Sequence, residues 1–237
     1  MQRFRRYTPW IAGTAVAGFL VWLVATAASV RPGERAGFLF GKAISADEYV
    51  RSLGAVTRDA ILRHGDRWRQ EAKPEELEQR AWERLILLKE ARSKRIRVSD
   101  REVVAELGRS PLFLGKDGRF DREGYPLIIQ HALGATPRTF EEDIRQTLMI
   151  QKLVGQSIPE PAVTEEEILE AFKKEKESKK PADDSPLDAA GKERIKKELE
   201  MRKRFQAYLA WYEDLLRRAA PKKPAADALP RPVKPKT

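Results

Sequence analysis

The sequence predicts a mainly α-helical protein, in which an N-terminal transmembrane helix precedes a helical domain with one short β-hairpin and a long C-terminal helix. Three observations predict this class. An uninterrupted apolar run extends from Trp10 to Val30. Apolar side chains then recur at helical spacing, with proline and glycine mainly between the periodic segments. Charged residues make up 35% of the chain and aromatic residues only 8%, which favours a helical class.

The apolar run has the length and the flanking charges of a membrane-spanning helix. At about 1.5 Å per residue it forms a rod of roughly 30 Å, the thickness of the hydrocarbon core of a bilayer. Arg3, Arg5 and Arg6 precede it. The positive-inside rule therefore places the N-terminus in the cytoplasm and residues 31–237 on the other side of the membrane.

A cleaved signal peptide is the alternative to a retained signal anchor. Ala25-Thr26-Ala27 matches the small-x-small cleavage pattern. Against cleavage, the apolar run is longer than the usual apolar region of a signal peptide, and bulky Trp22 and Leu23 lie close to the cleavage position. The sequence favours the anchor, and either interpretation exports the rest of the chain.

The net charge of +10 does not indicate a nucleic-acid-binding domain. Segments 1–35 and 221–237 each carry five basic side chains and one acidic side chain, so most of the excess lies outside 36–220. The chain has no cysteine, which excludes a disulfide framework and a thiolate zinc site. No glycine-rich phosphate loop or nucleophile elbow occurs, so we expect no cofactor, no metal and no nucleic-acid partner.

The exported part begins with a predicted hairpin and helix. Residues 38–44 have the composition of a tight hairpin, with the turn at Gly41-Lys42. Ser45 and Glu48 fit a capping box, in which each side chain bonds a free amide of the first helical turn. This pattern predicts a helix over roughly residues 46–70.

The next two helices also have clear start signals. Pro74 suits the first turn of a helix that extends to about Arg95. Its apolar stripe is wide, so this helix should face more than one partner element. Ser99 and Glu102 form a second capping box, with valines in the two hydrophobic-staple positions. The stripe of the first of these helices comprises Leu77, Ala81, Trp82, Leu85, Ile86, Leu88 and Ala91.

Three further helix starts follow. Asp121 can cap a short helix that ends near Leu133. Thr136-Pro137 is a cap followed by proline at the first helical position. Thr164 and Glu167 make a third capping box.

A long helix is predicted from Asp188 to Ala220, and its apolar stripe should be buried against the rest of the domain. Residues 179–187 are rich in charge and proline and are predicted to be a linker. The proline-rich and lysine-rich tail, 221–237, is predicted to be disordered; contact of this tail with anionic lipid is the less favoured alternative. The stripe comprises Ile195, Leu199, Phe205, Leu209, Tyr212 and Leu216.

A family resemblance is carried by the order and spacing of the hairpin, its Gly41-Lys42 turn and these further positions: Ile44-Ser45, Trp82–Ile86, Ile96–Val103, Pro111–Phe113, Asp117–Asp121, Tyr125 and Phe140–Arg145. Over residues 36–220 the chain resembles the N-terminal chaperone domain of the SurA/PpiD-type periplasmic chaperones. The anchor and the Asp117–Asp121 turn make it most similar to the membrane-anchored PpiD type. The predicted organisation is therefore a cytoplasmic N-terminus and signal anchor over 1–35, a chaperone domain over 36–220 and a tail over 221–237.

The resemblance implies a holdase of the bacterial inner membrane, with its main part in the periplasm. Its expected partners are unfolded, newly exported polypeptides, and the Sec translocon is a candidate neighbour. Many relatives carry a parvulin prolyl isomerase domain before the last helix. Here only about ten residues separate Glu177 from Asp188, far fewer than a domain needs. The chain is therefore not expected to be an enzyme.

Two other functions remain as alternatives. A non-catalytic scaffold would dock one specific membrane or envelope partner, and a weak isomerase would accelerate cis/trans exchange in proline peptides. The histidines, His64 and His131, match no parvulin site or catalytic dyad.

Phe113, Phe120 and Tyr125 are the candidate substrate-binding residues, because they lie in loop-rich sequence. A structural role, closing the core beneath the turn, is the favoured alternative for these three. Glu165–Glu167 suit the dipole of a helix start better than a metal site. No catalytic, cofactor-binding or metal-binding residue is predicted.

Overall fold

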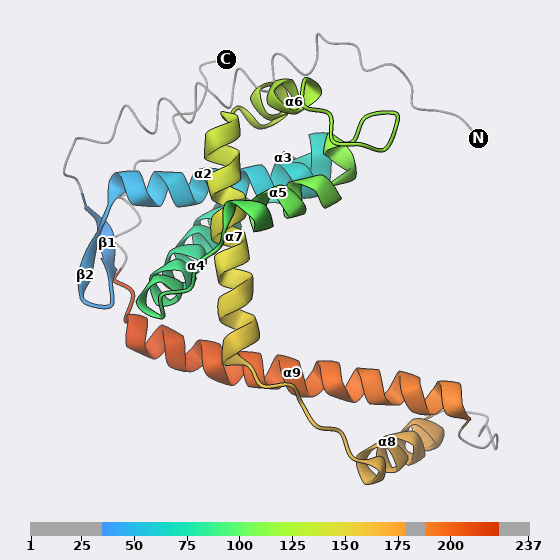
Figure 1. Ribbon diagram of the computed structural model, residues 1–237. Helices are drawn as coiled ribbons and strands as arrows, with labels where there is room; N and C mark the ends of the chain where they lie inside the picture. Colours follow the sequence, from blue (N-terminus) through green and yellow to red (C-terminus); the bar gives the residue numbers. More distant parts are fainter. Residues whose placement is uncertain (1–34, 179–187, 223–237) are drawn as a thin grey trace. The chain divides into compact units, whose positions relative to one another are not determined.

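A computed structural model describes residues 35–178 and 188–222 of the chain (Figure 1). Among these residues, every helix is too short or too polar to cross a bilayer. Several predicted features lie outside the described residues: Arg3, Arg5, Arg6, the apolar run from Trp10 to Val30, the linker 179–187 and most of the tail.

The described residues form two compact units. The first contains residues 35–153 and 219–222, and the second contains residues 154–178 and 188–218. Helices dominate both, and the first also holds a two-stranded antiparallel sheet. The prediction of a mainly helical protein with one short hairpin is confirmed for this part of the chain.

The hairpin pairs β1 (Arg35–Leu39) with β2 (Lys42–Ser45). Phe40 and Gly41 form its turn, with φ angles of 52° and 71°. The turn is therefore one residue earlier than predicted. Positive φ at both central residues matches the type I′ geometry, whose twist suits the flanking strands.

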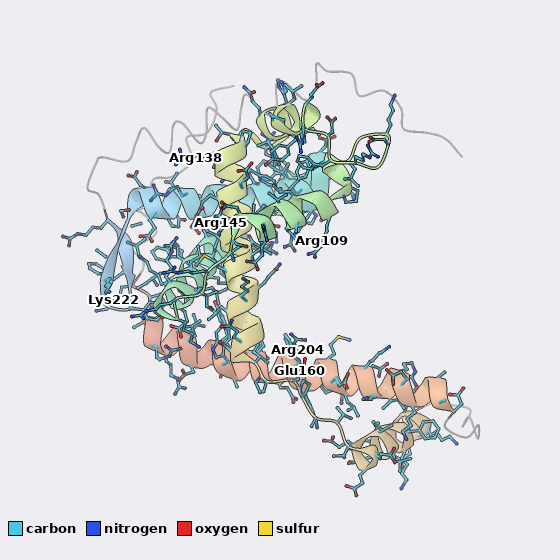
Figure 2. All side chains as sticks on the ribbon, in the orientation of Figure 1. Arg109, Arg138, Arg145, Glu160, Arg204 and Lys222 are labelled. Atoms are coloured by element: carbon cyan, nitrogen blue, oxygen red, sulfur yellow. The ribbon has the colours of Figure 1, made fainter. Side chains whose placement is uncertain are left out.

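A segment from the far end of the described chain pairs with the other edge of β1. The Phe38 N–H donates to the Lys222 carbonyl at 3.0 Å, and the Lys222 N–H donates to the Phe38 carbonyl at 3.1 Å. The Phe40 N–H donates to the Ala219 carbonyl at 2.7 Å. Lys222 lies beside the hairpin in Figure 2. Lys222 thus extends the sheet locally beyond β1.

Gly37 makes this close approach of backbones possible. A Cβ at this position would lie 2.5 Å from the Lys222 carbonyl oxygen and 2.8 Å from the Trp82 ring. Both distances are shorter than van der Waals contact, so a larger residue would force the backbone and the ring apart. Glycine is the residue type that fits here.

Three helical segments follow the hairpin: α2 (Ala46–His64), η1 (Gly65–Arg67) and α3 (Trp68–Glu71). The predicted helix over 46–70 is therefore interrupted. Gly65 ends α2, because its φ of 55° and ψ of −135° lie outside the right-handed helical region, and glycine adopts such a conformation with little strain.

The capping box predicted at the start of α2 forms in part. The Ser45 Oγ accepts a hydrogen bond from the Glu48 N–H at 3.2 Å, as predicted. The Glu48 carboxylate instead pairs with the Lys89 ammonium of α4 (Pro74–Ser93) at 2.8 Å. A cation from a distant part of the chain has replaced the local partner of this carboxylate.

Helix α4 packs against several elements of the first unit, as its wide stripe predicts. All seven predicted stripe residues are buried. The Trp82 ring lies 5.4 Å from the Tyr49 ring of α2. The Ala81 carbonyl accepts a buried hydrogen bond from the Ser52 hydroxyl of α2 at 2.8 Å.

The first unit continues with α5 (Asp100–Arg109), η2 (Pro111–Phe113), α6 (Gly124–Leu133) and α7 (Pro137–Ser157), whose last residues pass into the second unit. The second capping box is confirmed. Ser99 accepts from the Glu102 N–H, and the Glu102 carboxylate accepts from the Ser99 N–H at 2.9 Å.

The second unit contains α8 (Glu165–Ser178) and most of α9 (Ala189–Ala219). The third capping box is also confirmed. The Thr164 N–H donates to the Glu167 carboxylate at 2.9 Å, and the Glu167 N–H donates to the Thr164 hydroxyl at 3.3 Å.

The prediction that α9 buries its whole apolar stripe is wrong. Ile195 is only 2% exposed, but Phe205 is 59% and Leu209 is 42% exposed. Helix α8 has 14 residues against 31 in α9. A helix of that length contacts only part of its longer partner, which leaves these two side chains in solvent.

Candidate functional site

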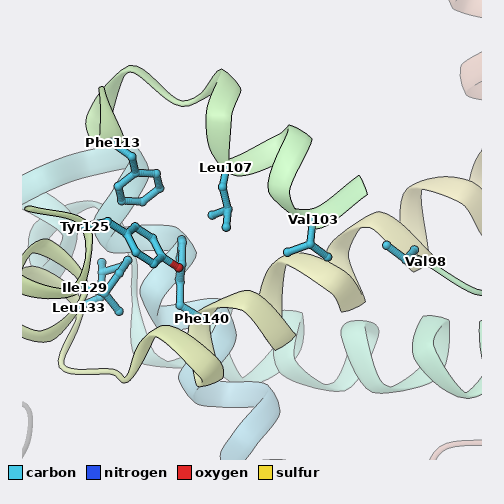
Figure 3. Packing of buried hydrophobic residues seen from close by; sticks show 8 residues of the cluster. All are labelled: Val98, Val103, Leu107, Phe113, Tyr125, Ile129, Leu133 and Phe140. Carbon is cyan, nitrogen blue, oxygen red and sulfur yellow. The ribbon is translucent and has the colours of Figure 1, made fainter. Parts of the chain in front are cut away.

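The structure brings the three predicted aromatic residues together in the first unit. The Phe113 ring lies 5.1 Å from the Tyr125 ring, and the Phe120 ring lies 5.2 Å from the Tyr125 ring. Phe140 of α7 joins them, 5.7 Å from Phe113. Figure 3 shows Phe113, Tyr125 and Phe140 beside the apolar side chains of α5 and α6. The rings meet edge to face or tilted, which suits the quadrupoles of aromatic rings.

Burial distinguishes these residues from one another. Phe113 is 2% and Tyr125 is 6% exposed, whereas Phe120 is half-buried. The Tyr125 hydroxyl donates to the Glu141 carboxylate at 3.5 Å, and burial raises the pKa of this hydroxyl above its ordinary value. The cluster closes the core beneath the turn. A substrate-binding role for these residues stays a prediction, and Phe120 is the most accessible of them.

The loop between η2 and α6 folds back on itself through one isolated bridge. Leu114 and Phe120 form an antiparallel bridge, and the Gly115 N–H donates to the Arg119 carbonyl at 2.7 Å. Gly118 has a φ of 74°, which glycine adopts without strain. This turn returns Phe120 to the cluster.

Asp121 caps the chain at the start of α6, three residues before the helix begins. Its carboxylate accepts hydrogen bonds from the Glu123 N–H at 3.1 Å and the Gly124 N–H at 2.9 Å. The predicted cap is thus present, but a turn separates it from the helix that was expected to begin there.

Two cations of α7 hold the start of α5. The Arg145 guanidinium donates to the Val98 carbonyl at 3.0 Å and to the Asp100 carboxylate at 2.8 Å. The Lys152 ammonium pairs with the Glu102 carboxylate at 2.6 Å. Figure 2 shows Arg145 on α7.

Glu102 is strongly acidic as a result. The hydrogen bond from Lys152 and those from Ser99 lower its pKa to about 2. Each partner donates a proton to the ionised carboxylate and so favours the charged form.

A partly buried charge cluster joins α2, α4 and α7. The Arg58 guanidinium pairs with the Asp143 carboxylate at 2.7 Å, and their side chains are 7% and 16% exposed. The Arg84 guanidinium donates to the Asp143 carbonyl at 3.1 Å and to the Thr147 hydroxyl at 3.2 Å. The buried Nε of Arg84 has no partner among the described residues. Burial raises the pKa of Asp143, while the two guanidinium groups oppose that rise.

Exposed apolar side chains are distributed differently in the two units. In the first unit they lie one to an element, on β1, α2, α5, η2 and α6: Phe38, Leu62, Val104, Leu112 and Leu127. In the second unit, three of the four lie on α9: Met201, Phe205 and Leu209, with Leu169 on α8.

These three residues of α9 are spaced by four and therefore form one row along the helix. Met201 is 67% exposed, the largest fraction of the three. We call Met201, Phe205 and Leu209 the α9 row. Phe205 and Leu209 belong to the stripe that the sequence predicts to be buried. The 31-residue length of α9, set against the short α8, is the signal in the sequence that could have identified the exposed row.

A shallow groove of about 360 Å³ lies between α8 and α9. Ile195 and Leu199 contribute apolar surface to it, and the side chains of Arg194, Glu175 and Arg202 line it. Arg194 pairs with Glu175 of α8 at 2.7 Å. The groove has mixed polarity and no arrangement of catalytic groups.

The acidic residues at the start of α8 have structural partners. Glu165 pairs with Lys192, and Glu167 pairs with Lys203 at 2.6 Å. These contacts lower the pKa of both carboxyl groups. Within the parts of the chain that the structure describes, no group of three or more His, Cys, Asp or Glu residues could hold a metal ion.

Comparison with known proteins identifies the family of the chain. Residues 1–154 match the SurA-like N-terminal domain, and this range covers more than half of the sequence. Its end coincides with the end of the long segment of the first unit at Leu153. No curated protein and no solved structure matches the chain. The chain belongs to the family of proteins with a SurA-like N-terminal domain.

Proposed function

We propose that the protein is a membrane-anchored periplasmic chaperone, a holdase that binds unfolded, newly exported polypeptides without an isomerase domain of its own. The SurA-like N-terminal domain over residues 1–154 carries this proposal, because that domain belongs to a chaperone-type family. Holding an unfolded chain requires exposed apolar surface beside charged surface that keeps the holder soluble. Exposed apolar and charged side chains occur together on both units.

The mechanism needs only reversible contact. When an unfolded chain binds, part of its apolar surface is withdrawn from water, and release exposes that surface again. The affinity therefore follows the apolar area that is covered. Exposed charged side chains on the same units limit self-association of the holder. Neither nucleotide nor metal enters this cycle.

The predicted anchor gives the proposal its location. The apolar run from Trp10 to Val30, preceded by Arg3, Arg5 and Arg6, would fix the holder to the inner membrane with its domain in the periplasm. A holder at that surface meets polypeptides as they leave the Sec translocon, which is therefore its proposed neighbour.

Aggregation of an unfolded protein tests the holdase activity. The full chain, reconstituted in lipid nanodiscs, should suppress light scattering by reduced α-lactalbumin, and empty nanodiscs should not. Inability to bind any unfolded polypeptide removes the proposal.

Crosslinking in native membranes separates a holdase from a scaffold. A holdase yields many unfolded clients at low occupancy, whereas a scaffold yields one partner in a fixed ratio.

A proline peptide tests the weak isomerase alternative. In the presence of the protein, its cis/trans exchange should proceed at the background rate.

Mass spectrometry of the mature protein tests the anchor. A retained N-terminal segment and resistance to extraction from membranes by alkaline carbonate support it. A mature chain that begins after Ala27 would retain the chaperone proposal but abolish the argument from location.

A further inference from the structure

The α9 row is an apolar strip on a face of α9 that is turned away from the start of α8. At about 100° per helical residue, Lys203 lies on the face of α9 opposite the row. Lys203 pairs with Glu167 and donates to the Ala162 carbonyl at 2.7 Å, so that opposite face is the one next to the start of α8. Helix α8 therefore cannot cover the row here.

The row is flanked by positive charge. The same helical geometry puts Arg202 on one side of the row and Arg204 on the other. Both side chains are exposed. The other basic side chains of α9 have acidic partners, but the described residues provide none for Arg202 or Arg204. Two unneutralised guanidinium groups thus border an exposed apolar strip, and Figure 2 labels Arg204 on α9.

The side chains in this region are adaptable or broad. Methionine is flexible and polarisable, and it fits many shapes of partner. Near the row, the Tyr208 and Tyr212 rings stack at 5.7 Å, and the Trp211 ring lies 5.9 Å from Tyr208. An apolar strip of this kind can receive different sequences without a fixed pocket.

From this combination we infer that the α9 row is a binding surface for extended segments of unfolded polypeptides in which large apolar residues alternate with acidic ones. The apolar side chains of the segment cover Met201, Phe205 and Leu209, and its carboxylates pair with Arg202 and Arg204. The charge pattern favours acidic segments over basic ones. This inference rests on the proposed holdase function and adds to it a site and a class of client.

A labelled peptide in which Leu and Phe alternate with Asp and Glu is the probe, and fluorescence anisotropy with the full chain in nanodiscs is the measurement. A matched peptide has Lys in place of every acid. We expect the acidic peptide to bind about tenfold more tightly than the basic one. Raising the salt concentration should reduce this preference, because the flanking charges are exposed.

Two double variants test the two parts of the surface. M201Q/F205Q should weaken binding of the acidic peptide about tenfold, because less apolar area is covered. R202Q/R204Q should abolish the preference for the acidic peptide over the basic one, while the affinity for the basic peptide changes little. The matched controls, V104Q/L127Q and R101Q/R138Q, remove exposed apolar and basic side chains from the first unit and should leave both affinities within about twofold.

A photoreactive version of the acidic peptide makes the test independent of variant folding. Its crosslinks to the wild-type chain should concentrate on residues 198–212. Crosslinks confined to the first unit, or unchanged affinity in both α9 variants, would overturn the inference. Sedimentation that converts from dimer to monomer in M201Q/F205Q would also overturn it, by showing that a second copy covers the row.

Reduced α-lactalbumin keeps the two proposals apart. If this protein binds but the acidic peptide shows no preference and no dependence on α9, the holdase proposal survives and the α9 site fails. If neither α-lactalbumin nor the peptide binds to the wild-type chain, the proposed function itself fails.

Discussion

Arg58 and Arg84 bring two positive charges into the region where α2, α4 and α7 meet, and the carboxylate of Asp143 faces them. The Arg58–Asp143 pair is largely shielded from water, with side chains 7% and 16% exposed. Such a pair adds little stability over a well-packed apolar pair, but losing one partner leaves a charge that water cannot solvate. Removal of the Asp143 carboxylate of α7 would therefore leave Arg58 of α2 without its counter-ion.

Asp143→Ala should lower the free energy of unfolding by about 3–5 kcal/mol, because Arg58 then stays buried without a counter-ion. Urea denaturation followed by circular dichroism measures the change. Glu106→Ala is the control. Its exposed pair with Arg109 should contribute less than about 1 kcal/mol. Equal effects of the two substitutions would contradict the assignment.

Glu102 makes the stability of the folded chain depend on pH. Its pKa is lowered to about 2 in the folded chain, so the unfolded chain binds this proton at a higher pH. The stabilisation is complete above the ordinary pKa of about 4.5 and is lost as pH falls from there towards 2.

The stability difference between the wild-type chain and Glu102→Gln should therefore shrink as the buffer is acidified from about pH 6 to about pH 3. Unfolding curves across this interval measure it, and a carbon NMR titration gives the pKa directly. A Glu102 titration midpoint near 4.5 would exclude the contacts with Lys152 and Ser99.

At the scale of helices and strands, starts were easier to predict than burial. The boxes at Ser99 and Thr164 formed as predicted because each depends on residues three positions apart. The Glu48 carboxylate, predicted to complete the capping box at Ser45, pairs with Lys89 instead, and no local pattern in the sequence predicts this distant partner. Helix α6 begins three residues later than Asp121 predicts for a different reason. An aspartate caps turns as well as helices, and here its carboxylate caps the turn before the helix.

At the candidate site, the loop-rich sequence around Phe113, Phe120 and Tyr125 identified these three residues as candidates, and their rings form one cluster. The burial of the apolar stripe of α9 was harder to predict. Burial of a helical stripe depends on the length of the facing helix, which periodicity does not contain. Phe205 was consequently assigned to the core although it is 59% exposed.

Two phenylalanine substitutions test this contrast. Phe113→Ala should lower the free energy of unfolding by about 3–5 kcal/mol, because it leaves a cavity among buried rings. Phe205→Ala should change it by less than about 0.5 kcal/mol, because its side chain lies largely in solvent. Urea denaturation of both variants provides the comparison. A loss in Phe205→Ala as large as in Phe113→Ala would show that the α9 row is buried in solution.

At the scale of the whole chain, the first unit is assembled from two stretches that are far apart in sequence. The match to the SurA-like domain ends at residue 154, yet Ala219 and Lys222 supply hydrogen bonds to β1. Pairing over such a separation leaves no periodic pattern in the sequence, so it could not be predicted from local patterns. The small side chain of Gly37 is the local trace of this contact.

Lys222→Pro tests the pairing, because proline removes the N–H that donates to the Phe38 carbonyl. The Phe38 and Phe40 amides should then exchange with deuterium more rapidly. Lys222→Ala should leave exchange unchanged, since the bonds come from the backbone. Equal protection in wild type and the proline variant would show that the pairing is absent in solution.

The same pairing determines when the first unit can complete its fold during synthesis. Ribosomes make Phe38 long before Lys222, so the outer edge of β1 stays open while α2 to α9 are being made. Contacts between such distant residues also form slowly once both are available, because a long loop must close first. The first unit therefore reaches its final form after most of the chain has emerged, and until then its own strand edge needs protection from other unfolded chains.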